Sequence, residues 1–388
     1  MTAPLVAVVY DCFFPVTTGG GERVYRRICE ILVERGATVS YLTRRLWAPG
    51  EPPTTPFLVE GVWAGEIYDA TGSRTTSGAV SFAIAIYRRL RRNRAELDIV
   101  IASALPVLTL IAARLAVRGT GIWLVGDWLE VWSWSKWRSY AGPVSGSIAY
   151  VLQSIGARCA ELDTVNSDFT AARLADSRSD TKPLVLGLVD LGGEPRAGVA
   201  ALQPPYVLFV GRHVADKRIV ALPAALAVAR STNPELRLIV AGDGPETPGL
   251  IEELERSGMA EFTDVIGRVD DERLSELLAG AAALVNPSSR EGFGLVVVEA
   301  AAVGVPSVVV AGENNAAVDL IEEGVNGTIA PSVDPDQLGS AIARVVNDEA
   351  MRGRTEEWYR RERVSHGLGA SVDELLVRYT DRSASRTR

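Results

Sequence analysis

Two carboxylates stand on either side of a glycine-rich turn near residue 290. Glu291 ends the polar run Ser288–Glu291, Gly292-Phe293-Gly294 follows, and Glu299 comes eight residues after Glu291 inside an apolar run. Backbone N–H groups of such a turn, and the positive end of the helix that follows it, favour an anion. Eight helical residues rise about 12 Å. A hydrolytic carboxylate pair needs about 5 to 9.5 Å, so the spacing disfavours hydrolysis.

Two cations precede this turn in the sequence, in "GRHVADK". Arg212 and Lys217 follow the apolar run 206–211, and two cations in such a loop suit the several charged oxygens of a diphosphate. With one acid toward a sugar and the other toward a ribose, the set fits a nucleoside diphosphate sugar. The alternatives are surface charges near a helix start and, for Glu299, a solvated helix face.

The elements that would position these residues form two similar halves. The first half begins with one βαβ unit. It consists of an apolar run, a glycine-containing loop, a helix pattern at 23–35 and a second apolar run. Runs of this kind predict a parallel sheet covered on both faces. The predicted strands are 5–10, 38–43, 98–103, 121–126, 162–167 and 183–189.

The same order of elements restarts after residues 192–205, whose composition predicts a linker. The predicted strands of the second half are 206–211, 236–242, 263–267, 283–288 and 306–311, and its helices are 218–230, 249–259 and 271–281. We therefore predict an α/β fold of two Rossmann-like doubly wound domains facing across a cleft, with ligands outside the carboxyl ends of the strands. The predicted domains are 1–192, with the tail 353–388 packing back on it, and 203–352.

Composition narrows the class of protein. The net charge of −8 argues against a dedicated nucleic-acid binder. Cys12, Cys29 and Cys159 follow no metal or disulfide spacing, which favours a reducing cytoplasm. Only His213 and His366 are present, which excludes most histidine-rich metal sites. We find no signal peptide pattern and no apolar stretch of about 20 residues, the length of a membrane span.

The stretch "NPSSREGFGLVVVEAAAVGVP" carries Glu-x7-Glu as Glu291 and Glu299. With "GRHVADK", "AGDGPE", "VIGRV" and "GVNGTIAP" in order, and "PVTTGGGERV" and "VNSDFTAARL" in the first half, the chain resembles the retaining glycosyltransferases of family 4, which have the GT-B fold. The resemblance implies a transferase (EC 2.4 class) that moves a hexosyl-type group from a nucleoside diphosphate sugar to a hydroxyl. The acceptor would be a glycan, a glycolipid or another small molecule, and no metal or other cofactor would be needed.

The resemblance also implies roles for individual residues. Catalytic roles fall to Glu291, Arg212 and Lys217, with the two cations on the diphosphate. Donor binding falls to Gly20, Gly267, Arg268, Phe293, Gly294, Leu295 and Glu299, the last on the ribose.

The chain departs from the family pattern at two places. Leu129 stands where family members often have a histidine, so that Asp127 or Glu130 would have to substitute, and "GENNAAVDLI" (312–321) replaces a more glycine-rich loop. The alternatives are a catalytically silent sugar-nucleotide-binding protein and a glycogen-synthase-like or phosphorylase-like enzyme. We find no segment for the pyridoxal lysine of a phosphorylase.

Two further patterns lie in the first half. Five of the eight tryptophans fall between Trp123 and Trp137, which indicates either an acceptor platform or core packing. The candidate acceptor residues are Asp127, Trp128, Glu130 and Trp132. A basic run indicates either a peripheral membrane contact or a solvated helix face, and it consists of Arg88, Arg89, Arg91, Arg92 and Arg94. We therefore expect the protein in the cytoplasm or at the inner face of the membrane.

Overall fold

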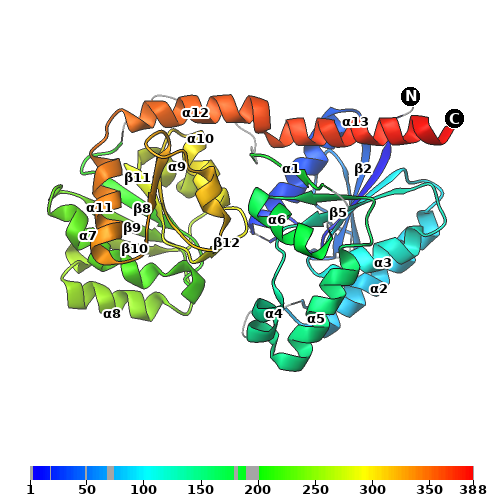
Figure 1. Ribbon diagram of the computed structural model, residues 1–388, viewed down its shortest axis with the longest axis horizontal. Helices are drawn as coiled ribbons and strands as arrows, with labels where there is room; N and C mark the ends of the chain where they lie inside the picture. The colour runs from blue at the N-terminus through cyan, green and yellow to red at the C-terminus, as the bar shows by residue number, and fades with distance from the viewer. Residues whose placement is uncertain are drawn as a thin grey trace. The chain divides into compact units, whose positions relative to one another are not determined.

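The computed structural model (Figure 1) describes residues 3–17, 19–48, 50–67, 74–178, 182–188 and 201–387. The chain divides into two compact units. Unit 1 consists of Met1–Leu191 with Gly367–Arg388, and unit 2 consists of Gly192–His366. Most of the predicted linker, 192–200, lies outside the described residues.

Unit 1 is built on a parallel sheet that has seven strands in the described part of the chain, in the order β3-β2-β1-β4-β5-β6-β7. The order reverses between β1 and β4, which is the doubly wound arrangement. The strands are β1 Leu5–Val9, β2 Thr38–Arg44, β3 Leu58–Trp63, β4 Ile99–Ser103, β5 Trp123–Trp128, β6 Leu162–Val165 and β7 Leu184–Val185. The predicted α/β class is confirmed. The edge strand β3 was missed, because "LVEGVW" carries a Glu and a Gly in a short half-exposed run.

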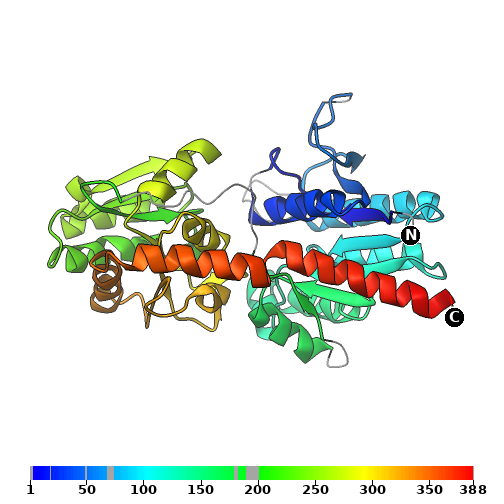
Figure 2. The same cartoon turned by 90° about the horizontal axis from the view of Figure 1, so that it is seen from above.

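Helices cover both faces of this sheet (Figure 2). One face packs against Phe82, Leu110 and Ala157, from α2, α3 and the end of α5. On the other side α13 lies beside α1, where Arg35 Nε donates to Asp373 Oδ1 at 2.6 Å. The helices are α1 Gly20–Glu34, α2 Thr76–Asn93, α3 Val107–Val117, α4 Trp134–Ala141, α5 Pro143–Gly156, α6 Asp168–Ser177 and α13 Leu368–Thr387.

Unit 2 repeats the doubly wound plan with a parallel sheet in the order β10-β9-β8-β11-β13-β15. Here the order reverses between β8 and β11, which pair from Val207 and Ala283. A separate parallel pair joins β12 to β14. The strands are β8 Tyr206–Val210, β9 Arg237–Ala241, β10 Thr263–Gly267, β11 Ala283–Asn286, β12 Arg290–Glu291, β13 Ser307–Val310, β14 Asn314–Asn315 and β15 Gly327–Ala330.

Buried aliphatic side chains of unit 2 join the sheet to its helices, among them Leu226, Val240 and Ile342. The helices are α7 Leu222–Arg230, α8 Thr247–Ser257, α9 Asp271–Gly280, α10 Leu295–Ala302, α11 Pro335–Val346 and α12 Met351–His366, and the 3-10 helices are η1 Ala215–Lys217, η2 Ile219–Ala221, η3 Ala260–Phe262 and η4 Ala316–Leu320.

The tail predicted over 353–388 is divided between the two units. Helix α12 lies within unit 2, and only the segment from Gly367 onward belongs to unit 1. Leu368 N donates to Leu188 O at 2.8 Å, which ties the start of α13 to the end of the unit 1 sheet. Among the described residues, no helix combines the length and the apolar character that crossing a bilayer requires.

Candidate functional site

The switch point of the unit 2 sheet gathers the predicted catalytic residues. Lys217 ends η1 in the loop after β8, and Glu291 lies in β12, shortly after β11. Because β8 and β11 are adjacent parallel strands, both loops leave the same edge of the sheet. Ser289 N donates to Asp216 O at 2.8 Å and holds the two loops together. Residues 74 positions apart in the sequence therefore meet at the place where doubly wound sheets bind ligands.

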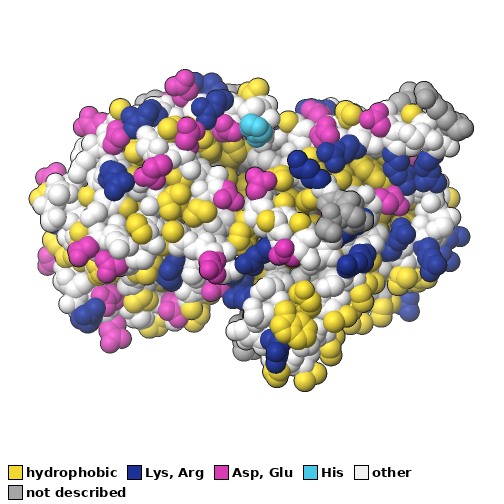
Figure 3. Space-filling view, in the orientation of Figure 1, with side chains coloured by type: hydrophobic (Ala, Val, Ile, Leu, Met, Phe, Trp, Pro, Cys, Tyr) yellow, Lys and Arg dark blue, Asp and Glu magenta, His cyan; other side chains and the backbone are white. Residues whose placement is uncertain are grey.

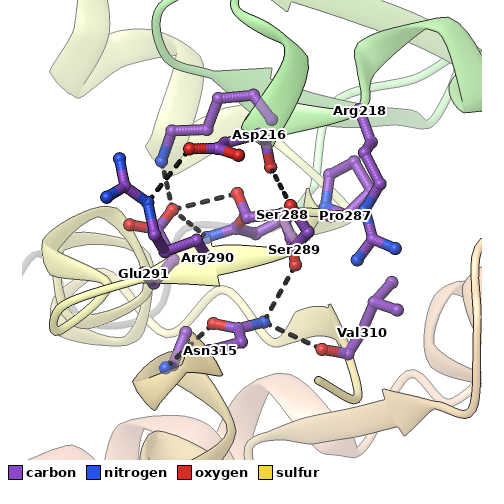
Figure 4. Close-up of polar contacts among 12 residues, drawn as sticks. Asp216, Arg218, Pro287, Ser288, Ser289, Arg290, Glu291, Val310 and Asn315 are labelled. Carbon is purple, nitrogen blue, oxygen red and sulfur yellow. Dashed lines mark hydrogen bonds and ion pairs between the residues drawn. The ribbon is translucent and has the colours of Figure 1, made fainter. Parts of the chain in front are cut away.

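Glu291 is the centre of a polar cluster (Figure 4). Its Oε1 accepts from Lys217 Nζ, from Ser288 Oγ at 3.0 Å and from Asn286 Nδ2 at 3.2 Å. The Lys217 and Glu291 side chains are 21% and 14% exposed. The ion pair therefore lies at the surface of the site, where a ligand can reach both partners, while the neutral donors Asn286 and Ser288 are buried beneath it.

A second buried amide supports this cluster from below. Asn315 Nδ2 donates to Ser288 O at 3.2 Å and to Val310 O at 2.8 Å, and its Oδ1 accepts from Ala317 N at 3.1 Å. Figure 4 shows Asn315 between the segment that contains Ser288 and the end of β13 at Val310. Sequence reasoning missed Asn286, Ser288 and Asn315. The available signal was an amide residue at the end of the apolar strand β11, Asn286, whereas Asn315 lies in the short strand β14, in the segment that departs from the family pattern.

The cations near the site differ in their surroundings. Arg290 Nε lies 3.0 Å from Asp216 Oδ2. Arg218 has a left-handed backbone (φ 48°), and its Nε donates to Pro287 O at 2.7 Å. Burial lowers the pKa of the Arg218 guanidinium. Arg212 is exposed, and no hydrogen bond joins its side chain to another described residue, so the structure brings Lys217 to Glu291 but does not bring Arg212 into the same cluster.

Gly294 sets the entrance to α10. Its φ of +96° favours glycine, and a Cβ there would lie 2.7 Å from the Ala317 Cβ. No side chain caps α10 in the described structure, so its first N–H groups are available to an anion. Phe293 and Leu295 flank this glycine and are half-buried.

The path between the two acids is not one continuous helix. Glu291 is in a strand, and the helix begins only at Leu295, because Gly294 breaks it. The helical part from Leu295 to Glu299 rises about 6 Å, and the rest of the path from Glu291 is strand and turn. Glu299 itself is half-buried on α10, between the buried Val298 and Ala300.

The neighbouring glycine loops pack around a buried histidine. His213 Nδ1 lies 2.7 Å from Thr247 Oγ1. Burial lowers the pKa of His213, and the charge of Asp243 opposes the shift less strongly. A Cβ at Gly244 would lie 2.4 Å from His213 O, which explains the glycine in "AGDGPE". The next strand ends at Gly267, whose O accepts from Gly242 N at 2.7 Å, and Arg268 beside it is exposed.

The glycine turn of unit 1 faces the position where the family pattern has a histidine. Gly20 is the exposed first residue of α1. A Cβ on the next residue, Gly21, would lie 3.1 Å from Leu129 Cδ1 and 3.1 Å from Tyr10 OH. An apolar side chain therefore occupies this place against the turn.

Two of the predicted acceptor residues belong to the core of unit 1, so these two assignments are wrong. Asp127 is 1% exposed and accepts from Tyr25 OH and Thr164 Oγ1, both at 2.5 Å. Burial raises the pKa of the Asp127 carboxyl, against the lowering effect of the two hydroxyl donors. Trp128 is 1% exposed, and its indole Nε1 donates to Asp163 Oδ1 at 2.9 Å. Neither side chain reaches a surface on which an acceptor could bind.

The other two predicted acceptor residues are half-buried. Trp132 Nε1 donates to Glu130 Oε2 at 2.6 Å. The Trp132 ring lies 4.7 Å from the Trp137 ring and 5.0 Å from the Tyr140 ring, centroid to centroid. An acceptor surface at Glu130 and Trp132 stays a prediction.

Two doubly wound units, with a polar cluster at the switch point of the second, define a protein of the GT-B class. Solved structures show the same fold: a sucrose-phosphate synthase from Thermosynechococcus elongatus has a TM-score of 0.74 at 19% identity and covers 98% of this chain and 100% of its own. Anabaena Alr3699/HepE, solved with UDP and glucose, has a TM-score of 0.68 at 16% identity and covers 97% and 100%.

Residues 194–362 match the family model described as Glycosyl transferases group 1. This match lies within unit 2, which is therefore similar to group 1 glycosyl transferases, and the predicted resemblance to glycosyltransferases is confirmed. D-inositol 3-phosphate glycosyltransferase of Nocardiopsis dassonvillei is 32% identical over 189 residues, which are 46% of this chain and 44% of that protein. Glycogen synthase of Mycobacterium tuberculosis is 35% identical over 162 residues, 41% and 37% of the two chains. The matches span less than half the length of these curated relatives.

Proposed function

We propose that this chain is a retaining glycosyltransferase that moves a hexosyl-type group from a nucleoside diphosphate sugar to a hydroxyl of a glycan, a glycolipid or another small molecule. The observation that carries the proposal is the contact of Lys217 with Glu291 at the switch point of unit 2. The similarity of unit 2 to group 1 glycosyl transferases supports it, as does the similarity in fold to a protein solved with UDP and glucose.

The proposed chemistry of the donor follows from where charge develops. As the bond between sugar and diphosphate breaks, negative charge grows on the leaving oxygen, and a fixed cation and a helix N-terminus stabilise it. Lys217 supplies the cation and the entrance to α10 supplies the backbone donors, at Phe293, Gly294 and Leu295. We therefore expect turnover without a metal ion. Arg212, which lies outside this cluster and is exposed, would bind the same diphosphate.

Glu291 would contact the transferred sugar. The incoming diphosphate competes with Glu291 for Lys217, but Asn286 and Ser288 still donate to the carboxylate and keep it oriented. Glu299, on the helix that begins at the phosphate, would accept from the ribose hydroxyls. Gly267 and Arg268 would lie beside the base, and Gly20 of unit 1 would approach the sugar or the phosphate.

The test is a panel of UDP, GDP, ADP and dTDP sugars, first by thermal shift and then by turnover, with the product anomer determined by NMR. A ligand at 100 times its dissociation constant stabilises the protein by about 2.7 kcal/mol. We expect retained configuration, activity in EDTA, and a fall in kcat of about 10² to 10³ in Lys217→Ala. The matched control is Arg256→Ala, an exposed cation of α8.

Three outcomes would contradict parts of this proposal. An inverted product would exclude the retaining mechanism. Wild-type rate and affinity in Lys217→Ala would exclude the site. Stabilisation by a nucleotide without transfer or hydrolysis would instead favour a sugar-nucleotide-binding protein, the alternative raised by Leu129.

A further inference from the structure

The hairpin of α4 and α5 in unit 1 has a solvent-facing surface of unusual composition. From residue 131 to residue 160 the chain has no Asp or Glu, although acids make up 48 of its 388 residues, about one in eight. The same stretch contains three cations, Lys136, Arg138 and Arg158. This part of a chain whose net charge is −8 is therefore positive.

One face of α5 exposes an apolar row to solvent. Its members are spaced four, three and four residues apart, so that they lie on one side of the helix, and their exposed fractions lie between 48% and 71%; they are Val144, Ile148, Val151 and Ile155. Exposed apolar side chains are ordinary when scattered singly, but a contiguous row indicates a contact surface.

Helix α4 adds aromatic side chains to this row. Trp134 is 42% exposed and Tyr140 is 59% exposed. The Trp134 ring packs edge-on against Tyr150 of α5 at 5.3 Å, and the Arg138 guanidinium lies 5.6 Å from the Trp134 ring centroid. Trp and Tyr with cations at their margin are typical of side chains at a membrane–water boundary. We call these two aromatics and the α5 row the hairpin surface.

Helix α2 also exposes apolar side chains and carries cations. It packs against α3, which in turn packs against α5. It exposes Val80, Ile84 and Tyr87, and no acid occurs between residues 75 and 95. Figure 3 shows apolar and basic side chains along this edge of unit 1. Among the predicted membrane cations, Arg89 is already paired with Glu60, whose carboxylate lies 2.5 Å from its Nε.

A cavity of about 550 Å³ opens beside α2 at the edge of the sheet. Its lining combines Arg88 and Arg92, and the paired Arg89 and Glu60, with apolar side chains such as those of Trp63 and Ile84, so that the arginines exceed the acid by two. Cations beside apolar side chains suit an anionic headgroup whose chains lie along the apolar part of the surface.

We propose that the hairpin surface inserts into the headgroup region of an anionic lipid bilayer, with α2 and its cavity lying on the same membrane. Amphipathic helices bind in this way, with their apolar faces buried in the headgroup region and their cations attracted to anionic lipid. A second copy of the chain is a poorer occupant. A symmetric interface would bring Lys136 and Arg138 of two copies together, and the segment offers no acid to neutralise them. The proposal does not depend on the catalytic assignment, because binding is measured without donor or acceptor.

The experiment is co-sedimentation of the full chain with vesicles of equal parts phosphatidylglycerol and phosphatidylcholine, against phosphatidylcholine alone. We expect binding to the anionic vesicles that weakens with salt, and its loss in Ile148→Glu/Val151→Glu. The control Val377→Glu changes an exposed valine of α13 in the same unit and should bind as the wild type does. Lys136→Ala/Arg138→Ala should weaken binding about fivefold for each cation removed.

All five substituted positions lie outside the buried core, so we expect each variant to fold, and thermal unfolding checks this. Quenching of tryptophan fluorescence by brominated lipid gives a second readout, which Trp134→Phe should reduce. The proposal is overturned if the wild type does not bind the anionic vesicles, or if Ile148→Glu/Val151→Glu binds as the wild type does. It is also overturned if the wild type forms a dimer that the Ile148→Glu/Val151→Glu change breaks, because the surface would then be a protein interface.

Discussion

Trp128→Ala should destabilise unit 1 rather than change the acceptor Michaelis constant. The side chain is 1% exposed, and truncating a buried Trp to Ala costs about 3 to 5 kcal/mol. The substitution also removes the indole N–H that donates to Asp163 Oδ1 at 2.9 Å. The buried carboxylate oxygen then lacks this donor, which costs about 1 kcal/mol or more. Arg178 Nη1 lies 3.5 Å from Asp163 Oδ2 and still neutralises the carboxylate. We therefore expect the cost of the lost hydrogen bond to stay at about 1 kcal/mol.

For a unit of this size each kcal/mol shifts Tm by about 2 to 4 °C, so a loss of about 4 to 6 kcal/mol lowers Tm by roughly 10 to 20 °C. The assay is thermal unfolding followed by near-UV circular dichroism, with acceptor kinetics measured well below the transition. Trp132→Ala is the matched comparison, because Trp132 is half-buried and its indole donates to Glu130 at the surface. It should shift Tm by only a few degrees and raise the acceptor Michaelis constant.

The reasoning fails if Trp128→Ala lowers Tm by less than Trp132→Ala does, or if it raises the acceptor Michaelis constant at unchanged Tm. Trp128→Phe separates the loss of buried volume from the loss of the hydrogen bond, since it keeps much of the aromatic volume and removes the indole donor. A double-mutant cycle with Asp163→Asn then isolates the hydrogen bond.

Two further predictions concern backbone strain and a buried charge. Gly294→Ala should destabilise unit 2 by more than Gly258→Ala, measured by urea unfolding. Both sites have positive φ, but only Gly294 meets a neighbour, whereas a Cβ at Gly258 meets nothing within 4 Å; equal losses would exclude the contact with Ala317. Asp127→Asn should gain stability relative to wild type as pH rises from about 4. The pKa of Asp127 is higher in the folded than in the unfolded protein. Its contribution to the free energy of unfolding of the wild type is therefore fully present below the unfolded pKa and is lost as pH rises through the folded pKa. A stability difference that does not change with pH would contradict this.

The sequence predicted most of the fold because buried parallel strands are continuous apolar runs. The strand at Thr263–Gly267 was placed with its observed bounds. Most other predicted strands differ by one or two residues at an end, but the strand predicted over 183–189 is only the two-residue β7, and residue 189 lies outside the described residues. The edge strand β3 gave no such run, since an edge strand is only partly buried. The helix after β8 begins at Leu222 rather than at residue 218, because Arg218 adopts a left-handed backbone that periodicity does not reveal.

The candidate site was predictable only where residue type and spacing carry the chemistry. Lys217 and Glu291 were identified by their neighbours in the sequence, and the structure joins them. Asn286 and Asn315 were missed because their role is to satisfy buried donors and acceptors, which depends on three-dimensional contact. Asp127 and Trp128 were wrongly assigned to an acceptor site. A sequence does not show whether an acid or an indole near a strand end faces solvent or makes a hydrogen bond inside the core, as these two do.

The arrangement around Glu291 gives the ligand-free site a defined geometry. An acid with Lys217 as its only support would lose its orientation whenever an anion drew the lysine away. Here the buried Asn286 and Ser288 donate to the same oxygen, and Asn315 fixes the Ser288 carbonyl. Because Asn286 and Ser288 are buried, they would hold the carboxylate in position if a phosphate drew Lys217 away, as the proposed function requires. On the proposed function the ion pair would be replaceable, and the buried donors beneath it would preserve the orientation of Glu291 during transfer.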